Sequence, residues 1–333
     1  MQEQFFNALR QRSADNTSFV EEIAGILDIG YDAAYRRINL RTNLSLEESV
    51  ILARHYKLSL NKLFEVDSPN TVMTELPPQP KDEKGLEQWF KVSLQNVQPL
   101  TKVKSAEFIW SGKDISLFHT LTDSFLTRYK MFVWLKDLDT SMTKSKITFD
   151  EWVREIPNSL LDSAFSLGNV YKNINITELW NDNTVTGTLQ QLLYYYEAGL
   201  VAKETALKIC QDIHDVIDHT EQQTIHQSIL GSESKKSFKL YKCDLHMLTN
   251  CLMVTTAHQK VFFVPFTVLT YFKVEHQATC DLMYGFLQKQ MNISKLLVNA
   301  GEKDRALFFN RMHKKIDMLK TRIEMDNEIF SLE

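Results

Sequence analysis

The spacing of apolar side chains along residues 1–66 is that of short amphipathic helices separated by turns. In residues 19–27 (FVEEIAGIL) the apolar positions share one helical face. A turn with a glycine, Asp28-Ile-Gly30, separates this segment from a second short helix that begins at Tyr31. With the helical patterns on either side, residues 1–66 predict five helices, two of which form the helix-turn-helix arrangement of DNA-binding domains.

Capping boxes predict where three helices begin. In a capping box, Ser or Thr precedes the helix and Glu follows three residues later, so that each side chain bonds the other residue's backbone N–H. The pattern occurs at Ser18, at Ser45 and at Thr148. We therefore expect helices to start directly after these three residues.

From about residue 86 onward the pattern changes once, near residue 238. Helical spacing prevails before that point, apart from one β-type run, AEFIWSG at 106–112. After it, the runs FKLYKCDL, CLMVTT and VFFVPFTVL predict two or three antiparallel strands. The order of helices, strands and helices favours an α+β domain with a small antiparallel sheet in a chain that is mainly α. The helices are expected at 86–97, 116–137, 149–172, 177–197, 203–228, 275–293 and 302–328.

A proline-rich stretch divides the chain. Four of the seven prolines lie within residues 67–85. Because proline fixes φ and removes a backbone donor, we expect this stretch to be an extended linker. The predicted domains are thus 1–66, a helix-turn-helix domain, and 86–333, an α+β domain.

Composition places the chain among ordinary globular proteins. Of its 333 residues, 44% are hydrophobic and 24% are charged, and the net charge of −4 gives no overall positive field. No stretch approaches the ~18 apolar residues of a membrane span, and the N-terminus lacks the layout of a signal peptide. The four cysteines form no CxxC pair. We expect a cytoplasmic protein with reduced cysteines.

The helix that begins at Tyr31 carries side chains suited to DNA. Ala34 and Ile38 lie one turn apart and anchor it to the preceding helix. Arg and Asn side chains can pair with guanine and adenine edges, whereas Arg37 and residues 41–43 suit phosphate contacts. Tyr35 either faces DNA or packs at the edge of the core. The expected DNA-binding residues are Tyr31, Asp32, Tyr35, Arg36, Arg37, Asn39, Arg41, Thr42 and Asn43.

Residues 19–66, with this pattern, turn and flanking helices, resemble the repressor/Cro-like (XRE-type) helix-turn-helix regulators of bacteria. The resemblance covers about a sixth of the chain. It implies a five-helix domain that binds a two-fold symmetric operator as a dimer, with Tyr31, Asp32 and Arg36 at the positions that contact bases. The chain departs from the family after the recognition helix, where Leu40 stands near the place of a frequent glycine.

The charge of this module is unusual for a DNA-binding domain. Residues 1–66 hold eight Lys and Arg against nine Asp and Glu, a net charge of −1. Strong DNA binders are usually basic, but Arg36, Arg37 and Arg41 cluster without an acid among them. We expect weak binding by a monomer and dependence on dimerisation. The alternative is a signalling or scaffold protein whose helical module docks to protein, with these arginines on a solvated face.

The larger domain carries no enzyme signature. It lacks GxxxxGK[ST], GxGxxG, GxSxG and HExxH motifs, so we expect neither an enzyme nor a bound cofactor. Histidines and aspartates near 214–226 share a helix, but a metal site would need a ligand from elsewhere, and we expect none. Aromatic runs at 192–196 and 262–266 either line a pocket for a small-molecule or peptide effector or form core.

The last predicted helix has apolar residues at alternating steps of three and four. They are Phe309, Met312, Ile316, Leu319, Ile323 and Phe330, interrupted by Asp326. Such a seam either joins two copies of the chain or packs on its own domain. The sequence as a whole predicts a dimeric, cytoplasmic, bacterial transcription regulator that binds double-stranded DNA, with dimerisation and effector sensing in the larger domain and no membrane contact.

Overall fold

A computed structural model describes residues 1–13, 18–64, 71–244, 248–298 and 300–330, with only the backbone for residues 62 and 326–330. The chain forms two compact units, Met1–Met73 and Thr74–Glu333. The division falls within the predicted linker. The predicted end of the first domain at residue 66 and the linker residues 67–70 lie outside the described residues.

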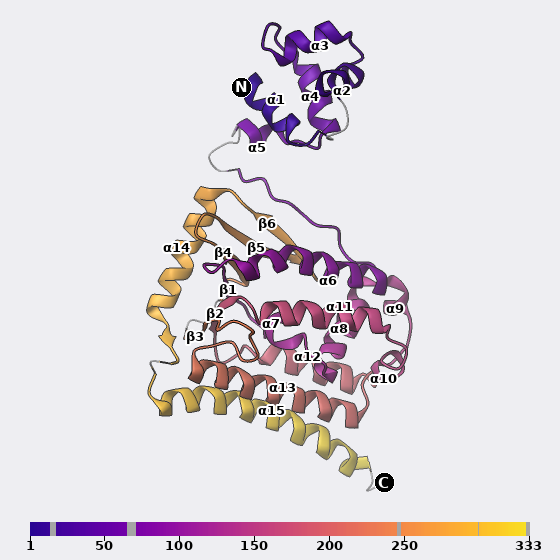
Figure 1. Cartoon of the computed structure of the whole chain (residues 1–333). Helices are drawn as coiled ribbons and strands as arrows, with labels where there is room; N and C mark the ends of the chain where they lie inside the picture. Colours follow the sequence, from indigo (N-terminus) through magenta and orange to yellow (C-terminus); the bar gives the residue numbers. More distant parts are fainter. Residues whose placement is uncertain (14–17, 65–70, 245–247, 299, 331–333) are drawn as a thin grey trace. The chain divides into compact units, whose positions relative to one another are not determined.

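The smaller unit contains five helices: α1 (Gln2–Arg10), α2 (Phe19–Leu27), α3 (Tyr31–Ile38), α4 (Leu46–His55) and α5 (Leu60–Phe64) (Figure 1). They enclose one apolar cluster. Phe5, Phe6 and Leu9 of α1, Ile23 of α2 and Leu52 of α4 are almost fully buried in it. The amphipathic pattern of the sequence therefore does form five helices around a shared core.

Two of the three predicted capping boxes are present. Ser45 accepts a hydrogen bond from the Glu48 backbone N–H, and the Glu48 carboxylate accepts one from the Ser45 N–H. The same reciprocal pair joins Thr148 and Glu151 at α10 (Phe149–Trp152). The prediction at Ser18 was wrong in part, because α2 begins there but the Ser18 side chain makes no capping bond.

The larger unit is an α+β fold built on a seven-stranded mixed sheet. Its strand order is β6-β5-β4-β1-β2-β3-β7. Strand β1 pairs with β2 in parallel and with β4 in antiparallel orientation, and β2 pairs with β3 in parallel. The strands are β1 (Glu107–Ser111), β2 (Asn175–Trp180), β3 (Phe238–Lys242), β4 (Cys251–Thr255), β5 (Lys260–Thr267), β6 (Thr270–Val274) and β7 (Lys295–Leu296). The predicted small antiparallel sheet was wrong: of the three predicted runs, β4 and β5 are antiparallel neighbours, whereas β3 lies beyond β1 and β2, where it pairs with β2 in parallel and with β7 in antiparallel orientation.

Strand β2 replaces the first part of a predicted helix at 177–197. Its last five residues are all buried, so the strand has no alternation of apolar and polar positions. A strand covered on both faces need not alternate, and here the buried polar residues Thr177 and Glu178 also interrupt the apolar run, so the sequence shows neither of the patterns that mark a strand. The segment from Asn181 to Thr184 then turns the chain into the helix that follows.

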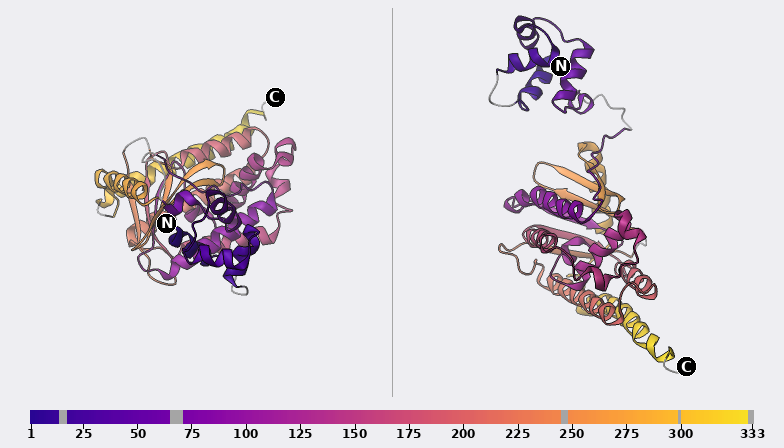
Figure 2. Two further views of the ribbon diagram at one scale, coloured as in Figure 1. Left: turned by 90° about the horizontal axis from the view of Figure 1, so that it is seen from above. Right: turned by 90° about the vertical axis from the view of Figure 1, so that its right-hand side faces the viewer.

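Helices cover the sheet and share one large apolar core with it. Helix α13 contacts β3 and also α15, and these two helices run side by side (Figure 1, Figure 2). Two predicted helices are divided: the one at 116–137 into α7 and α8, and the one at 149–172 into α10 and α11, with Pro157 between them. The remaining bounds are α6 (Glu83–Val97), η1 (Gln98–Lys102), α7 (Leu117–Thr120), α8 (Phe125–Leu138), α9 (Thr140–Lys144), α11 (Asn158–Tyr171), α12 (Thr186–Glu197), α13 (Lys203–His226), α14 (Gln277–Ile293) and α15 (Glu302–Phe330).

Part of the predicted linker is attached to the sheet. The backbone of Glu75 exchanges hydrogen bonds of 3.1 and 3.0 Å with that of Lys273 in β6. Gln79 Nε2 donates to Thr267 Oγ1 at 3.1 Å. Residues 71–82 contain no helix and meet the edge strand β6 at Glu75, whereas residues 83–85, the end of the predicted linker, already belong to α6.

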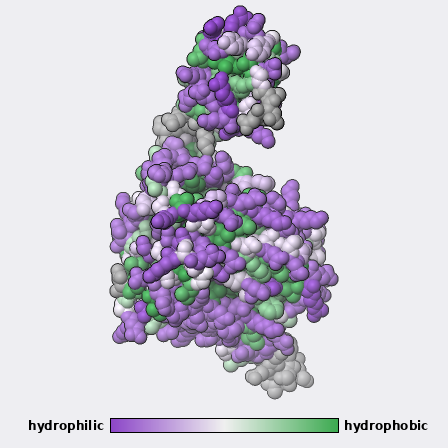
Figure 3. Space-filling model, in the orientation of Figure 1, coloured by the Kyte–Doolittle hydropathy of each residue, from purple (hydrophilic) through white to green (hydrophobic). Residues whose placement is uncertain are grey.

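Hydrophilic side chains predominate on the face of the larger unit that Figure 3 shows, with smaller apolar areas between them. Among the described residues, no helix combines the length and the apolar character needed to cross a membrane.

Candidate nucleic-acid interface

Helix α3 turns one side to the core of the smaller unit and the other to solvent. Ala34 is fully buried and Ile38 is half-buried, as the sequence predicted. On the opposite side, the exposed fractions of Tyr31 and Tyr35 are 51% and 42%. Tyr35 thus points outward rather than into the core. Asp32, Arg36 and Asn39 are also exposed.

The turn before α3 does not depend on its glycine. Gly30 has φ −66°, which any residue adopts, and a Cβ there would meet nothing within 4 Å. The left-handed residue of the turn is Asp28, with φ 53°. Aspartate tolerates this conformation better than most residues, so Asp28 ends α2 and sets the start of α3.

Arg37 faces α4 instead of solvent. Its Nη2 lies 2.7 Å from Glu48 Oε1 and its Nε lies 3.0 Å from Glu48 Oε2, a bidentate pair. The side chains are 18% and 19% exposed. The bond to Arg37 lowers the pKa of the Glu48 carboxyl, although partial burial acts in the opposite direction. Because Glu48 also caps α4, this one carboxylate joins α3 to the start of α4.

The end of α3 uses a left-handed leucine. Leu40 has φ 59°, and its N–H donates to Arg37 O while the Arg41 N–H donates to Arg36 O. These two bonds define a Schellman motif, in which glycine is usual because it has no Cβ penalty. Leu40 therefore adopts the backbone geometry that glycine usually takes at this position of the motif. Leu40 itself is 47% exposed.

Gln2, which the sequence analysis did not single out, holds the segment after α3. Its Nε2 donates to Arg37 O at 2.8 Å and to Thr42 O at 2.9 Å, and its Oε1 accepts from the Leu44 N–H at 3.1 Å. All three partners are main-chain atoms. Gln2 thus fixes the backbone on which Arg41, Thr42 and Asn43 stand.

The exposed side of α3 and the segment after it form a continuous polar surface. It is made of Tyr31, Asp32, Tyr35, Arg36, Asn39, Arg41, Thr42 and Asn43, all exposed. In the described part of the chain, the guanidinium groups of Arg36 and Arg41 make no ion pair or side-chain hydrogen bond, while Asn39 Nδ2 donates to Tyr35 O at 2.9 Å. Two cations therefore extend into solvent without a partner among the described residues of the unit.

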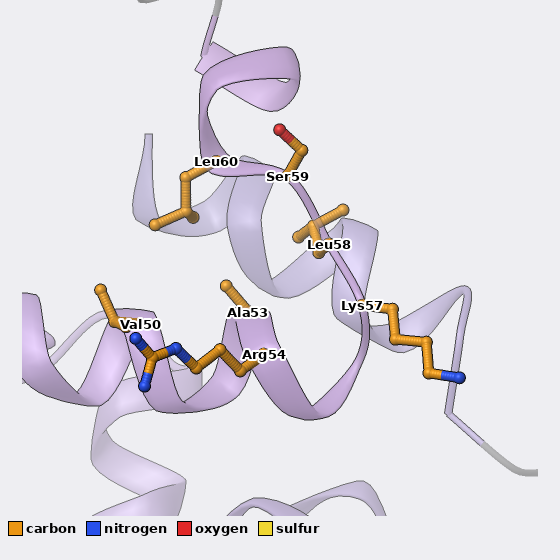
Figure 4. Close-up of a pocket in the computed structure, with 7 residues that line it drawn as sticks. All are labelled: Val50, Ala53, Arg54, Lys57, Leu58, Ser59 and Leu60. Atoms are coloured by element: carbon orange, nitrogen blue, oxygen red, sulfur yellow. The ribbon is translucent and has the colours of Figure 1, made fainter. Parts of the chain in front are cut away.

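A shallow apolar groove lies elsewhere on the smaller unit. It has a volume of about 430 Å³ and lies between the end of α4 and α5 (Figure 4). Val50, Ala53, Leu58 and Leu60 form its apolar lining; Arg54 and Lys57 also line it, and the Lys57 side chain extends away from the other residues.

The candidate residues of the larger unit lie partly in its core and partly at its surface, where Tyr194 and Phe266 are exposed. Among the described residues, no three His, Cys, Asp or Glu side chains are grouped to hold a metal. Leu192 and Phe262 of the aromatic runs are buried, and neither run lines the hollow of about 40 Å³ next to His119 and His219. The four cysteines are free and buried.

The apolar seam of α15 packs on its own unit. Phe309, Met312, Ile316, Leu319 and Ile323 are buried there, beside α12 and α13. The side chains of Asp326 and Phe330 lie outside the described residues. The described part of the seam is thus closed to a second copy of the chain.

Neither a family model, nor a curated protein, nor a solved structure matches this chain.

Proposed function

We propose that the chain is a cytoplasmic, sequence-specific DNA-binding transcription regulator of the repressor/Cro-like type, which acts as a dimer on an operator. The observation that carries the proposal is the exposed side of α3 and the segment after it, where Arg36 and Arg41 have no partner among the described residues and stand on a backbone held by Gln2 and Arg37. A pre-organised basic surface on a short exposed helix is what major-groove recognition requires.

The proposed roles follow from the direction of each side chain. Tyr31, Asp32, Tyr35 and Arg36 face the bases, where Arg36 can pair with a guanine edge. Asn39 also contacts a base if its Nδ2 gives up the hydrogen bond to Tyr35 O and donates to an adenine edge instead. Arg41, Thr42 and Asn43 contact phosphates and fix the register.

Arg37 receives a different role from the one that its sequence position predicts. Its Nε and Nη2 are bonded to Glu48 and its Nη1 donates to Ala33 O, so it has little capacity left for a phosphate. We assign it to positioning α3 against α4, whereas the phosphate contact predicted for it stays untested.

Dimerisation and effector sensing are assigned to the larger unit, by a surface other than the described seam of α15. Two recognition helices would then enter successive major grooves about 34 Å apart. The hollow beside His119 is much smaller than the ~300–1,000 Å³ of typical ligand pockets, so an effector would have to open it further. No enzymatic step is part of the proposal.

The test is a DNA titration of the full chain at two salt concentrations, preceded by selection of bound fragments from random duplexes. The proposal expects one enriched sequence with two-fold symmetry and affinity that falls steeply with salt, because phosphate contacts release counterions. Absence of enrichment together with absence of salt-dependent binding would contradict it.

The groove of Figure 4 favours the alternative, a module that docks to protein. Its apolar floor and the cations Arg54 and Lys57 suit an amphipathic peptide with acidic residues. The same titration separates the two functions. A docking module leaves random and selected DNA unbound at both salt concentrations.

A further inference from the structure

Two histidines meet between α13 and α15. His214 Nδ1 lies 2.6 Å from His313 Nδ1, and the planes of the two rings differ by only 9°. Atoms of stacked rings remain about 3.5 Å apart, so a separation of 2.6 Å means that the rings meet edge to edge. The side chains are 14% and 19% exposed. The contact is therefore a hydrogen bond between two imidazoles, partly sheltered from water.

The outer nitrogen of each ring faces a carboxylate of the other helix. His214 Nε2 lies 2.9 Å from Asp317 Oδ1, and His313 Nε2 lies 3.0 Å from Asp218 Oδ1. An ionised carboxylate only accepts hydrogen bonds, so both Nε2 atoms must carry hydrogen. Each aspartate follows the histidine of its own helix by four residues, but it contacts the histidine of the other helix.

With both Nε2 positions protonated, the inner contact fixes the number of protons. Two bare Nδ1 atoms would repel each other through their lone pairs, and two Nδ1–H groups would repel each other through their hydrogens. Only one hydrogen between them gives a bond of 2.6 Å. We propose that His214 and His313 share a single proton, and that this proton is a pH-dependent clasp that holds α15 on α13.

The clasp is predicted to work within a range of pH. Uptake of a second proton puts two N–H groups face to face. Loss of the shared proton leaves either two lone pairs in contact or a bare Nε2 facing Asp218 or Asp317. Because both changes break the arrangement, α15 should be held most firmly when a single hydrogen lies between the two Nδ1 atoms.

Other charged groups near the clasp belong to the same two helices. Asp215 accepts from Gln211 at 3.0 Å, and Lys320 donates to Gln211 Oε1 at 3.3 Å. Burial raises the pKa of the Glu221 carboxyl, against which Arg305 and His313 act. Four other elements pack on α13 or α15, namely α7, α8, α12 and β3. Among the described residues, none of them supplies a titratable side chain that is bonded to either imidazole ring.

Release of α15 would break its bonds to the turn that follows the carboxyl end of the central strand β2. Arg311 Nη1 of α15 lies 2.7 Å from Asp182 Oδ2, and Lys315 Nζ lies 3.1 Å from Asn183 Oδ1 and Thr186 Oγ1. These residues form the turn from β2 into α12. The clasp thus lies next to the bonds through which α15 holds that turn, and it operates whether or not the chain binds DNA.

The experiment is hydrogen–deuterium exchange of the full chain between about pH 5 and 8, the range in which histidines titrate, corrected for intrinsic exchange. Protection of peptides from α15 should pass through a maximum and fall on the order of tenfold on both sides, as expected for losing a charge-assisted bond. His313→Phe keeps a planar ring without nitrogens and should flatten the profile. His226→Gln, which changes a histidine of α13 outside the clasp, should leave the maximum in place.

If His313→Phe does not fold, Asp317→Asn provides the decision. It removes a charge that favours the shared proton, so the alkaline side of the maximum should move to lower pH. A wild-type profile without a maximum, or one that is the same in Asp317→Asn, would overturn the proposal. Protection that depends on added zinc and disappears with a chelator would also overturn it, because a metal would then occupy the place of the proton.

Discussion

The two units use their polar side chains differently. In the larger unit, charged groups between elements bond to each other. Glu178 of β2 is fully buried and accepts from Ser116 Oγ at 2.6 Å, with His119 Nε2 2.9 Å away. Lys130 of α8 bonds Asp114 at 2.8 Å and Thr188 at 2.7 Å. These side chains are bonded within the fold.

In the smaller unit the same kinds of groups separate into two sets. Arg37 and Gln2 are bonded inside, whereas Arg36 and Arg41, next to them in the sequence, are left in solvent. A buried polar group without a partner is costly, but an exposed one can still gain a partner from a ligand. In the larger unit, charged side chains thus stabilise contacts between elements of the fold, whereas in the smaller unit Arg36 and Arg41 remain available to bind another molecule.

The largest effect is expected where the larger unit packs α15. Phe309→Ala should lower the free energy of unfolding by about 3–5 kcal/mol, because it removes a fully buried ring and leaves a cavity. Denaturant unfolding of the full chain measures this loss. Met318→Ala on the same helix is the control, since Met318 is 66% exposed and should cost less than about 0.5 kcal/mol. Equal losses would mean that the seam is not core.

The next effect tests the cations of the smaller unit. Arg36→Ala should weaken binding to the selected duplex by about 1–3 kcal/mol and relax the preference at one base pair, with little change in stability. Arg54→Ala, an equal loss of charge on α4, should weaken binding far less. Fluorescence anisotropy with matched and mutated duplexes measures both. If the two variants lose the same affinity, general charge rather than the surface of α3 is responsible.

The pair that joins α3 to α4 should make the smaller unit sensitive to acid. The pKa of the Glu48 carboxyl in the folded chain lies below the ordinary value of 4.5. Glu48 therefore stabilises the fold fully at pH values above 4.5, and this stabilisation is lost as the pH falls through the lowered pKa of the folded chain. Glu48→Gln should cost about 1.5 kcal/mol near neutral pH and nothing in acid. Hydrogen exchange of peptides from α3 and α4, compared between the wild type and Glu48→Gln as a function of pH, measures this difference in stability.

The matched control for that pair is the neighbouring acid. Glu47 is exposed and has no arginine partner in the described structure, so Glu47→Gln should change the same peptides by less than about 0.5 kcal/mol. A wild type and a Glu48→Gln variant that remain equally different down to low pH would show that the carboxylate charge is not what stabilises this contact.

The sequence predicted those parts of the molecule that depend on neighbours in the chain. The capping boxes at Ser45 and Thr148 and the burial of Ala34 are of this kind, since each involves residues within one turn. The sequence did not predict strand β2, because its partners Glu107 and Phe238 lie about 60 or more residues away in the chain. In addition, the strand is buried on both faces, so its sequence does not alternate between apolar and polar residues.

The same distance explains the missed side chains. Gln2 bonds main-chain atoms 35 to 42 residues away, and a carbonyl or N–H exists at every position, so no residue type marks the partner. The sequence places His214 in a group of histidines and aspartates on a single helix. Its actual partner, His313, follows 99 residues later and is brought there only by the packing of α15.

Gln2 offers a way to sharpen the comparison without altering the exposed surface. Gln2→Ala should lower the stability of the smaller unit by about 1 kcal/mol and speed exchange in residues 39–44, because two carbonyls and an N–H lose a partner. Gln4→Ala, on the same helix, loses one bond to Leu63 O and should leave residues 39–44 unchanged. An equal response to both variants would show that α1 acts only as a whole.

The smallest effect is a gain, and it tests whether the end of α3 is strained. Leu40→Gly should raise stability by about 0.5 kcal/mol, because a left-handed residue other than glycine costs about 1–2 kcal/mol and glycine returns part of that through its freer unfolded chain. Leu46→Gly is the matched control. That leucine is 74% exposed at the start of α4, in helical backbone, so glycine should cost about 0.5–1 kcal/mol there. Thermal unfolding distinguishes opposite signs even when each shift is small. If Leu40→Gly gains stability and binds the selected duplex as the wild type does, Leu40 only ends the helix; if it gains stability and loses affinity, the exposed leucine belongs to the DNA-binding surface beside Arg36 and Arg41.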